Sequence, residues 1–408
     1  MSMPWYGELP ERWKAIRIKN LFALIDERNF KPLSDVQLLS LYTAFGVKPN
    51  KEIEKTTGNR AVTADNYKIV HVDDIIVNII LCWQGAIGVS KYDGVTSPAY
   101  DVYRAKSEAV NVDYFNYLYR LPLFSGECYK AGRGIMAMRW RTYSDHFTAI
   151  TVPMPPRNEQ DQIVRYLNWK VSRINKLINA KRRQIELLQE QKHITIKNTV
   201  RYTDGCKKCK LKNLAFFKSG TNLTALQIEP VGDYPVYGGN GIRGYYPEFS
   251  HFGEYLLIGR QGALCGNVHY INEHFWATEH AITVKPNDII HIKWLYYLLI
   301  DMNLNQYSIA AAQPGLSVEY IVNLSTYFPT LEKQKTIAIY LDEQCGRIDK
   351  IVRKLNNEIA LFTEYRTRLI SDVVTGKLDV RGVVVPEYEA EDESIVNNDD
   401  MDEYNDDI

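Results

Sequence analysis

The side chains best suited to recognising another molecule lie in a glycine-rich stretch of the second half of the chain. Residues 238–246 are Gly-Gly-Asn-Gly-Ile-Arg-Gly-Tyr-Tyr. In the major groove of DNA, an amide such as that of Asn240 suits adenine, and a guanidinium such as that of Arg243 suits guanine. Tyr245 can stack on a base or bond a phosphate, and the glycines allow close approach of the backbone. The stretch therefore predicts a DNA-contacting loop; the alternative is a tight hairpin whose glycines serve only the turn.

Other candidate DNA contacts are amide, basic and aromatic side chains spread over both halves of the chain. Each of them either contacts DNA or is a solvated surface group. In the second half these are Arg260, Gln261, Thr278, His280 and Gln313. In the first half they are Trp83, Gln84, Lys55, Asn59, Arg60, Arg133, Arg139 and Arg141.

Motifs of catalysis and nucleotide binding are missing from the sequence. It contains no G-x-G-x-x-G, no G-x-x-x-x-G-K-[ST], no G-x-S-x-G and no H-E-x-x-H. Cys206 and Cys209 have a metal-like spacing, but no second pair accompanies them, which favours free thiols over zinc. We therefore expect a binding protein that is not an enzyme, with no metal and no cofactor in this chain.

Composition is that of a globular protein with an acidic end. The chain has 408 residues, of which 45% are hydrophobic and 24% charged. Its 49 basic and 49 acidic residues balance, but 11 of the acidic ones lie between Glu387 and Ile408, where there is no Lys or Arg. The rest of the chain is thus basic, which suits a polyanionic partner. With no signal pattern and no membrane-spanning run, we expect a cytoplasmic protein.

An internal repeat defines the larger segments on which these residues lie. The segment that starts at Pro155 recurs at Pro329, an offset of 174 residues, with Tyr166-Leu167 matched by Tyr340-Leu341. Gln84-Gly85-Ala86 recurs as Gln261-Gly262-Ala263, and Trp83 precedes the first copy where Arg260 precedes the second. Two copies of one unit predict pseudo-two-fold symmetry and a partner that is itself doubled. The exchange of Trp83 for Arg260 is what two domains that recognise different sequences would show.

Each repeat carries a long amphipathic helix. Apolar residues recur at steps of three and four after Pro155 and after Pro329, which predicts two helices of roughly 40 residues. We expect them to pack antiparallel and hold two domains apart; alternatively, each covers its own domain. Because basic residues interrupt the stripes, part of them could instead accept helices of another subunit: Lys181, Arg182, Lys192 and Arg366.

The predicted fold is α+β, with two mixed α/β domains separated by two long antiparallel helices that form a coiled coil, as a pseudo-two-fold repeat. Strands around Gly85 and around Gly262, each followed by a short helix, support mixed domains. The predicted ranges are domain 1 at 1–156, helix 1 at 157–203, domain 2 at 204–330, helix 2 at 331–377 and an acidic, disordered tail at 378–408.

With this layout the chain resembles the specificity (S) subunit of type I restriction–modification systems. The resemblance extends to about residue 380. It rests on the duplicated organisation and on these segments: Ile258-Gly-Arg-Gln-Gly-Ala-Leu-Cys-Gly266, Gln313-Pro-Gly-Leu-Ser317, Pro329 to Leu341, Glu364-Tyr-Arg366 and Val373 to Leu378. The first domain lacks the Gly-Gly-Asn-Gly stretch and the Arg-Gln pair, so the family's contact residues do not transfer to it.

The resemblance implies a sequence-specific DNA-binding subunit with two target-recognition domains, each recognising one half of a split, asymmetric site in double-stranded DNA. Two methyltransferase (M) subunits and motor-nuclease (R) subunits would join it, and they would bind S-adenosylmethionine, ATP and Mg²⁺. Four matched residues of the long helices are candidate partner contacts: Gln160, Tyr166, Gln334 and Tyr340. The alternative function is a scaffold that binds no DNA and holds two copies of a partner protein through its helices.

Overall fold

The computed structural model describes residues 2–3, 5–43, 46–50, 63–135, 140–201, 205–262, 264–308 and 315–388. Candidate residues Lys55, Asn59, Arg60, Arg139 and Gln313 lie outside the described residues, as does the acidic segment from residue 389 on. The chain divides into two compact units. Unit 1 comprises Met1–Arg182 and Asn357–Ile408, and unit 2 comprises Arg183–Asn356.

Unit 1 is built around a four-stranded antiparallel sheet in the order β4-β11-β8-β9. The apolar run at Ile75-Ile76-Val77 forms β8 and is buried on both faces: Ile75 and Val77 join the main core, and Ile76 joins a smaller cluster with Leu39 and Val70. The strands are β1 (Ser2–Met3), β2 (Gly7–Glu8), β3 (Lys14–Arg17), β4 (Phe22–Ile25), β5 (Leu39–Tyr42), β6 (Gly46–Pro49), β7 (Lys68–Val70), β8 (Ile75–Asn78), β9 (Ile87–Val89), β10 (Gly94–Thr96), β11 (Tyr100–Ala105) and β12 (Thr151–Met154).

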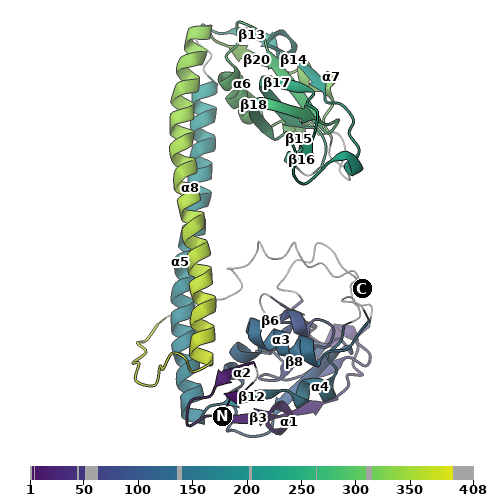
Figure 1. The fold of residues 1–408 in the computed structure, drawn as a ribbon, viewed down its shortest axis with the longest axis vertical. Coiled ribbons are helices and arrows are strands. Elements are labelled where there is room, and N and C mark those ends of the chain that lie inside the picture. Colours follow the sequence, from purple (N-terminus) through teal and green to yellow (C-terminus); the bar gives the residue numbers. More distant parts are fainter. Residues whose placement is uncertain are drawn as a thin grey trace. The chain divides into compact units, whose positions relative to one another are not determined.

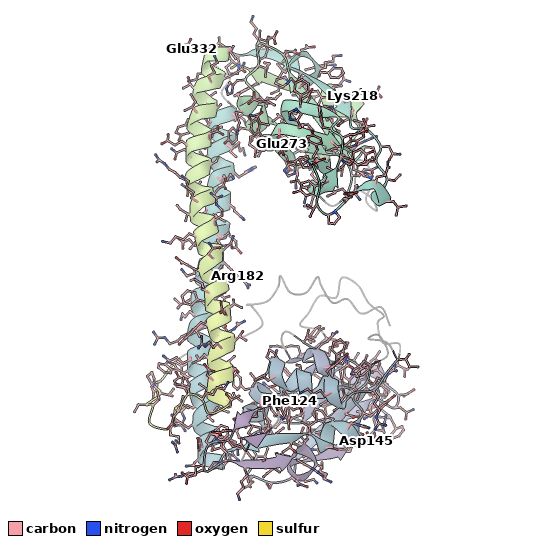
Figure 2. All side chains as sticks on the ribbon, in the orientation of Figure 1. Phe124, Asp145, Arg182, Lys218, Glu273 and Glu332 are labelled. Atoms are coloured by element: carbon pink, nitrogen blue, oxygen red, sulfur yellow. The ribbon has the colours of Figure 1, made fainter. Side chains whose placement is uncertain are left out.

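Helices cover the main core of unit 1 with aromatic side chains. Phe124, labelled in Figure 2, packs its ring 4.6 Å from that of Tyr119 and 6.1 Å from that of Phe147. Such ring pairs add to the stability that burial of their area provides. The short helices are α1 (Ile18–Leu21), η1 (Leu33–Asp35), η2 (Cys82–Gln84), α2 (Val112–Tyr119), α3 (Pro122–Ala131) and α4 (Ser144–Ala149).

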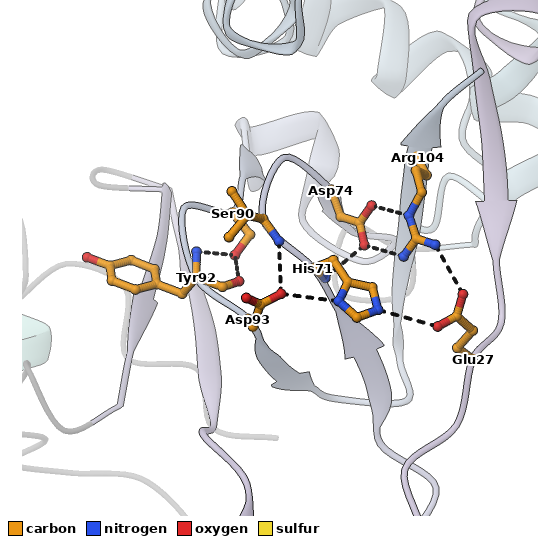
Figure 3. A network of polar contacts seen from close by, with 8 residues as sticks. Glu27, His71, Asp74, Ser90, Tyr92, Asp93 and Arg104 are labelled. Carbon is orange, nitrogen blue, oxygen red and sulfur yellow. Dashed lines mark hydrogen bonds and ion pairs between the residues drawn. The ribbon is translucent and has the colours of Figure 1, made fainter. Parts of the chain in front are cut away.

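A network of charged residues joins three segments of unit 1 (Figure 3). Arg104 on β11 donates from Nε and Nη2 to the two carboxylate oxygens of Asp74, at 2.8 Å each, and from Nη1 to Glu27 at 3.1 Å. The side chain of Asp74 is only 1% exposed, so this fork supplies the charge partner that a buried carboxylate needs. His71 Nδ1 lies 3.1 Å from Asp93 Oδ1. These contacts hold the sheet together and give the cluster a structural role.

Unit 2 contains a six-stranded sheet in the order β14-β19-β17-β18-β15-β16, in which only the β15–β18 pair is parallel. Helix α6 packs on β17, β18 and β19 (Figure 1) and buries Trp294, Leu295 and Leu299. The elements are β13 (Lys207–Lys210), η4 (Leu211–Asn213), β14 (Ala215–Ser219), η5 (Ala225–Gln227), β15 (Tyr234–Gly238), β16 (Gly241–Tyr246), β17 (His251–Gly259), β18 (Val268–Ala277), β19 (Ala281–Pro286), α6 (Ile292–Asp301), η6 (Leu304–Tyr307), α7 (Val318–Val322) and β20 (Ser325–Phe328).

The repeat seen in the sequence is a repeat of topology. The order β4-β11-β8-β9 in unit 1 corresponds to β14-β19-β17-β18 in unit 2. In unit 1, β12 pairs antiparallel with β3 just before the first long helix; in unit 2, β20 pairs with β13 just before the second. The predicted α+β class with two mixed domains is confirmed.

The two long helices are α5 (Arg157–Val200) and α8 (Leu331–Val374), of 44 residues each. In unit 1 they run antiparallel, because Asn175 pairs with Arg366 and Lys181, further along α5, pairs with Glu358, further back along α8. In unit 2, Lys192 Nζ lies 2.7 Å from Asp349. Lys181, Lys192 and Arg366, the interruptions of the apolar stripe, therefore bond the opposite long helix. The predicted pairing of the helices is confirmed in each unit.

Candidate nucleic-acid interface

Three turns of unit 2 come together at the ends of its strands. They are the β15–β16 turn at residues 239–240, the β17–β18 turn at residues 260–267 and the β18–β19 turn at residues 278–280. The backbone N–H of Arg260 donates to the carbonyl of His280 at 2.8 Å, which joins the second turn to the third. Asn267 Nδ2 donates to Asn240 Oδ1 at 3.0 Å, which joins the second to the first. We call these three turns the converging turns.

Two glycines allow this close approach. A Cβ on Gly259 would lie 2.0 Å from the carbonyl oxygen of Gly239, and a Cβ on Gly239 would lie 2.8 Å from that of Gln261. Neither distance is tolerable for a carbon atom, so only glycine fits at these positions. The close backbone packing places Asn240 and Gln261, both exposed, on the same surface.

Residues 238–246 form a hairpin and not an open loop. Strand β15 ends at Gly238 and β16 begins at Gly241, whose φ of 103° lies in the left-handed region. The open-loop conformation was wrong because a high glycine content also accommodates bulged, tightly turned strands, whereas the DNA contact of this stretch stays a prediction. The side chain of Arg243 passes over Gly238, where a Cβ would lie 2.4 Å from Arg243 Cδ, and it is exposed. Tyr245 is half-buried and pairs its main chain with Glu229.

Arg260, Gln261 and His280 form a hydrogen-bonded group within the converging turns. Gln261 Oε1 lies 2.6 Å from His280 Nδ1, and His280 Nε2 lies 3.1 Å from Glu279 Oε1. Arg260 Nη1 donates to Ser219 Oγ at 3.1 Å and, more weakly, to the Glu279 carbonyl at 3.5 Å. These contacts hold the polar side chains in place before any partner binds, which is the condition for selective recognition.

Thr278 does not belong to the contact surface. It is fully buried, and its Oγ1 donates to the carbonyl oxygen of Tyr237 at 3.1 Å. Its prediction as a DNA contact is therefore corrected: the hydroxyl fastens the β18–β19 turn to β15. The Tyr237 hydroxyl donates to Glu273 at 2.8 Å, and burial together with this carboxylate raises the pKa of Tyr237, so the phenol stays neutral.

Unit 1 has a corresponding turn at Trp83-Gln84-Gly85. Gly85 has a φ of 90° and its counterpart Gly262 has a φ of 93°, so the two turns share their unusual backbone. Gln84 is exposed, as Gln261 is. Trp83 donates from Nε1 to the Ile80 carbonyl at 2.8 Å and packs edge-on against Tyr129. In this turn the aromatic side chain of Trp83 therefore corresponds to the guanidinium of Arg260 in unit 2.

Arg133 and Arg141 lie opposite each other in unit 1. Their backbones exchange two hydrogen bonds, of 2.9 and 3.0 Å, and Arg133 is exposed. Tyr129 and Trp140 stack nearby with ring centroids 4.8 Å apart. These two rings were not predicted from the sequence, and neither were Asn267 and Glu279 in unit 2. Nothing in residue type alone distinguishes them from other aromatic and polar surface residues.

Gln160 and Gln334 are buried, so their prediction as partner contacts is corrected. Both are 0% exposed. Gln160 Oε1 accepts from the N–H of Asn111, the residue that caps α2, at 2.8 Å, and its Nε2 donates to the Pro155 carbonyl at 2.8 Å. Gln334 repeats this with the N–H of His291, which precedes α6, at 2.7 Å, and the Pro329 carbonyl at 2.9 Å. Each glutamine clamps a short helix of its unit to the start of a long helix.

The matched tyrosines differ in exposure. Tyr166 is 7% exposed and packs edge-on against Trp169, so it belongs to the core of unit 1. Its prediction as a partner contact is therefore also corrected. Tyr340 is 47% exposed beside Ile339, which is 69% exposed. Only Tyr340 of the four predicted partner contacts is thus available at the surface.

Neither a metal cluster nor a membrane span is found in the part of the chain that the structure describes. No three His, Cys, Asp or Glu residues gather there in a way that could hold a metal ion. Within the same residues, no helix combines the length and the apolar character needed to cross a membrane.

Comparisons with known proteins point to one family. Residues 203–361 match the family model described as "Type I restriction modification DNA specificity domain". A relative named type I restriction enzyme EcoprrI specificity subunit, from Escherichia coli, is 54% identical over 110 residues, which are 27% of each chain. The matched part thus spans about a quarter of that relative's length. The type I restriction enzyme MjaVIII specificity subunit of Methanocaldococcus jannaschii is 22% identical over 92% of this chain and 95% of its own.

A solved structure has the same fold. Its description is "Structural basis underlying complex assembly and conformational transition of the type I R-M system", and it matches with a TM-score of 0.62 at 16% identity. The match covers 91% of this chain and 100% of the other. The fold common to both has two mixed domains and two long helices.

Proposed function

We infer that this chain is the DNA-recognition subunit of a type I restriction–modification complex, as the match of residues 203–361 to the specificity-domain model and the similarity to specificity subunits support. One observation carries the inference. The segment that matches the specificity domain, residues 203–361, contains all three converging turns. The exposed amide and guanidinium groups of unit 2 therefore lie in the part of the chain where a DNA-binding function is expected.

In unit 2, Asn240, Arg243 and Gln261 make base contacts. Amide and guanidinium groups form the paired hydrogen bonds that distinguish adenine and guanine in the major groove. Arg260 is half-buried and bonded to Ser219, so it stiffens the surface and offers its remaining donors. Tyr245 and His280 line the same surface. Gln313 extends the proposed contacts beyond the described residues.

In unit 1, the turn with Trp83 and Gln84 takes the corresponding role for a different half-site. Gln84 is the exposed amide, and Trp83 offers apolar contact where Arg260 would donate hydrogen bonds. Arg133 and Arg141 contact phosphates, which position a protein on the duplex without selecting a sequence. Lys55, Asn59, Arg60 and Arg139 join this set by their residue type.

The long helices set the distance between the two half-sites. We propose recognition domains at 1–156 and 204–330, held apart by α5 (Arg157–Val200) and α8 (Leu331–Val374), which end three residues before the predicted bounds, and an acidic tail at 378–408. Two methyltransferase subunits and the motor-nuclease subunits bind outside the DNA surface, and exposed Tyr340 on α8 is a contact for one of them. The partners bring S-adenosylmethionine, ATP and Mg²⁺, and this chain supplies no catalytic group.

Salt dependence tests the proposal against a scaffold that binds no DNA. We expect the affinity of the assembled methyltransferase complex for a DNA duplex to fall steeply with salt, because each phosphate contact releases a counterion. With about six phosphate contacts the affinity would drop on the order of 10³-fold between 50 and 200 mM salt. Fluorescence anisotropy with a labelled duplex measures it. A complex that assembles but shows no salt-dependent DNA binding would favour the scaffold.

A further inference from the structure

Two successive side-chain contacts connect Glu279 to His280 and His280 to Gln261. His280 Nδ1 lies 2.6 Å from Gln261 Oε1, and His280 Nε2 lies 3.1 Å from Glu279 Oε1. The side chains of Glu279 and His280 are 34% and 37% exposed, and that of Gln261 is exposed. The imidazole is therefore held between a carboxylate on one side and the amide on the other.

The chemistry of these groups makes the chain directional. A carboxylate only accepts hydrogen bonds, so His280 Nε2 must carry the proton that faces Glu279. The other ring nitrogen, Nδ1, faces Gln261 Oε1, which also only accepts, so a hydrogen bond to this oxygen needs a proton on Nδ1 as well. A ring with a single proton would instead accept from the NH2 group of the amide. In both arrangements one end of the Gln261 amide is held and the other end faces outward. Without the imidazole, the amide of an exposed glutamine would rotate freely about its last bond. The contact thus decides whether the amide can offer its donor and acceptor in a fixed direction.

We propose that Glu279 and His280 are positioning residues that orient the amide of Gln261 toward one base edge. The inference rests on the proposed DNA-recognition function and adds to it. His280, first selected for its own contact with DNA, acts through Gln261, and Glu279 acts through His280. Glu279 also reaches Arg260, but only through its backbone carbonyl, at 3.5 Å. Replacing the Glu279 side chain therefore tests the carboxylate while it keeps that contact.

Methylation mapping with the complete complex tests this assignment. The chain and its variants are produced with their methyltransferase subunits, and N6-methyladenine is mapped by single-molecule sequencing. Gln261→Ala, His280→Ala and Glu279→Ala should each relax one and the same base position of the half-site, with discrimination lowered about tenfold, the scale of a lost amide contact. Glu279→Gln should retain most of the discrimination, because its oxygen can still accept from His280 Nε2.

The measured quantity is the ratio of methylation at sites with the correct base to methylation at sites with an incorrect base. Because both values come from one sample, a partly folded variant still gives an interpretable ratio. Glu248→Ala is the matched control, since Glu248 is an exposed carboxylate outside the converging turns. Its motif should stay unchanged. If Gln261→Ala relaxes a position and His280→Ala does not, the positioning role is wrong. It is also wrong if His280→Ala lowers methylation equally at every site, which is a structural defect. If deleting the whole chain leaves the motif intact, the proposed function itself fails.

Discussion

At the scale of residues, Gln160 and Gln334 show how a repeat preserves a contact. Each is fully buried and joins the residue before a short helix to the proline before a long helix. A buried polar side chain is favourable only when its hydrogen bonds are made, and here both ends of the amide are used. The repetition of these glutamines thus reflects the attachment of each domain to its long helix.

The contribution of this clamp to stability can be measured. Gln334→Ala removes the partners of the His291 N–H and of the Pro329 carbonyl, and each unpaired group costs about 1–3 kcal/mol. Because water can hydrogen-bond to these groups and lower part of this cost, we expect the free energy of unfolding to fall by about 2–3 kcal/mol. Urea denaturation of the full chain reports it. Gln191→Ala, at an exposed position of α5, should change it by less than about 0.5 kcal/mol. Equal effects of the two substitutions would contradict the clamp.

The residue scale is also where the sequence predicted least. Thr278 and Arg243 looked equally able to contact DNA, but one side chain is buried under β15 and the other is exposed. Asn267 escaped notice because it bonds Asn240 of another turn, and Glu279 because it acts on the distant Gln261 only through its neighbour His280. Residue type indicates which hydrogen bonds a side chain can make. Only the packing of the turns decides where they are made.

At the scale of elements, the long helices were predictable because a sustained apolar period of three and four residues is typical of an amphipathic helix and of no other regular structure. The hairpin at 238–246 was not, because its glycines suit a loop and a bulged strand equally well. Burial along the helices is uneven: Leu167 and Ile178 are fully buried, whereas Ile185 in the middle of α5 is half-buried. The ends of each helix are covered by a domain as well as by the other helix.

A change in helix length tests the role of these elements as a spacer. We expect that inserting seven residues after Arg183 in α5 and seven before Asn357 in α8 keeps the apolar stripe in phase. Seven residues add about 10 Å of helix, or about three base pairs at 3.4 Å each. The methylated motif should then keep both half-sites and lengthen its unspecified middle by about that amount. A complex that methylates the original motif with unchanged spacing would show that the helices do not set the distance between the half-sites.

At the scale of the whole molecule, the two units share the order of four strands, the strand pair before each long helix and the glutamine clamp. They differ in their surface turns, where Trp83 in one unit corresponds to Arg260 in the other. Shared scaffolds with different exposed turns are what a protein needs to recognise two unlike half-sites with one architecture. We therefore propose that this one chain determines the sequence that its complex modifies.

The most direct measurement is a map of N6-methyladenine in cells that make this chain with its methyltransferase partners, compared with cells in which only this chain is deleted. We predict a split, asymmetric motif, with two specified halves around an unspecified middle, that disappears on deletion and returns when the chain is restored. A motif that persists unchanged without the chain would contradict the claim, because some other subunit would then be selecting the sequence.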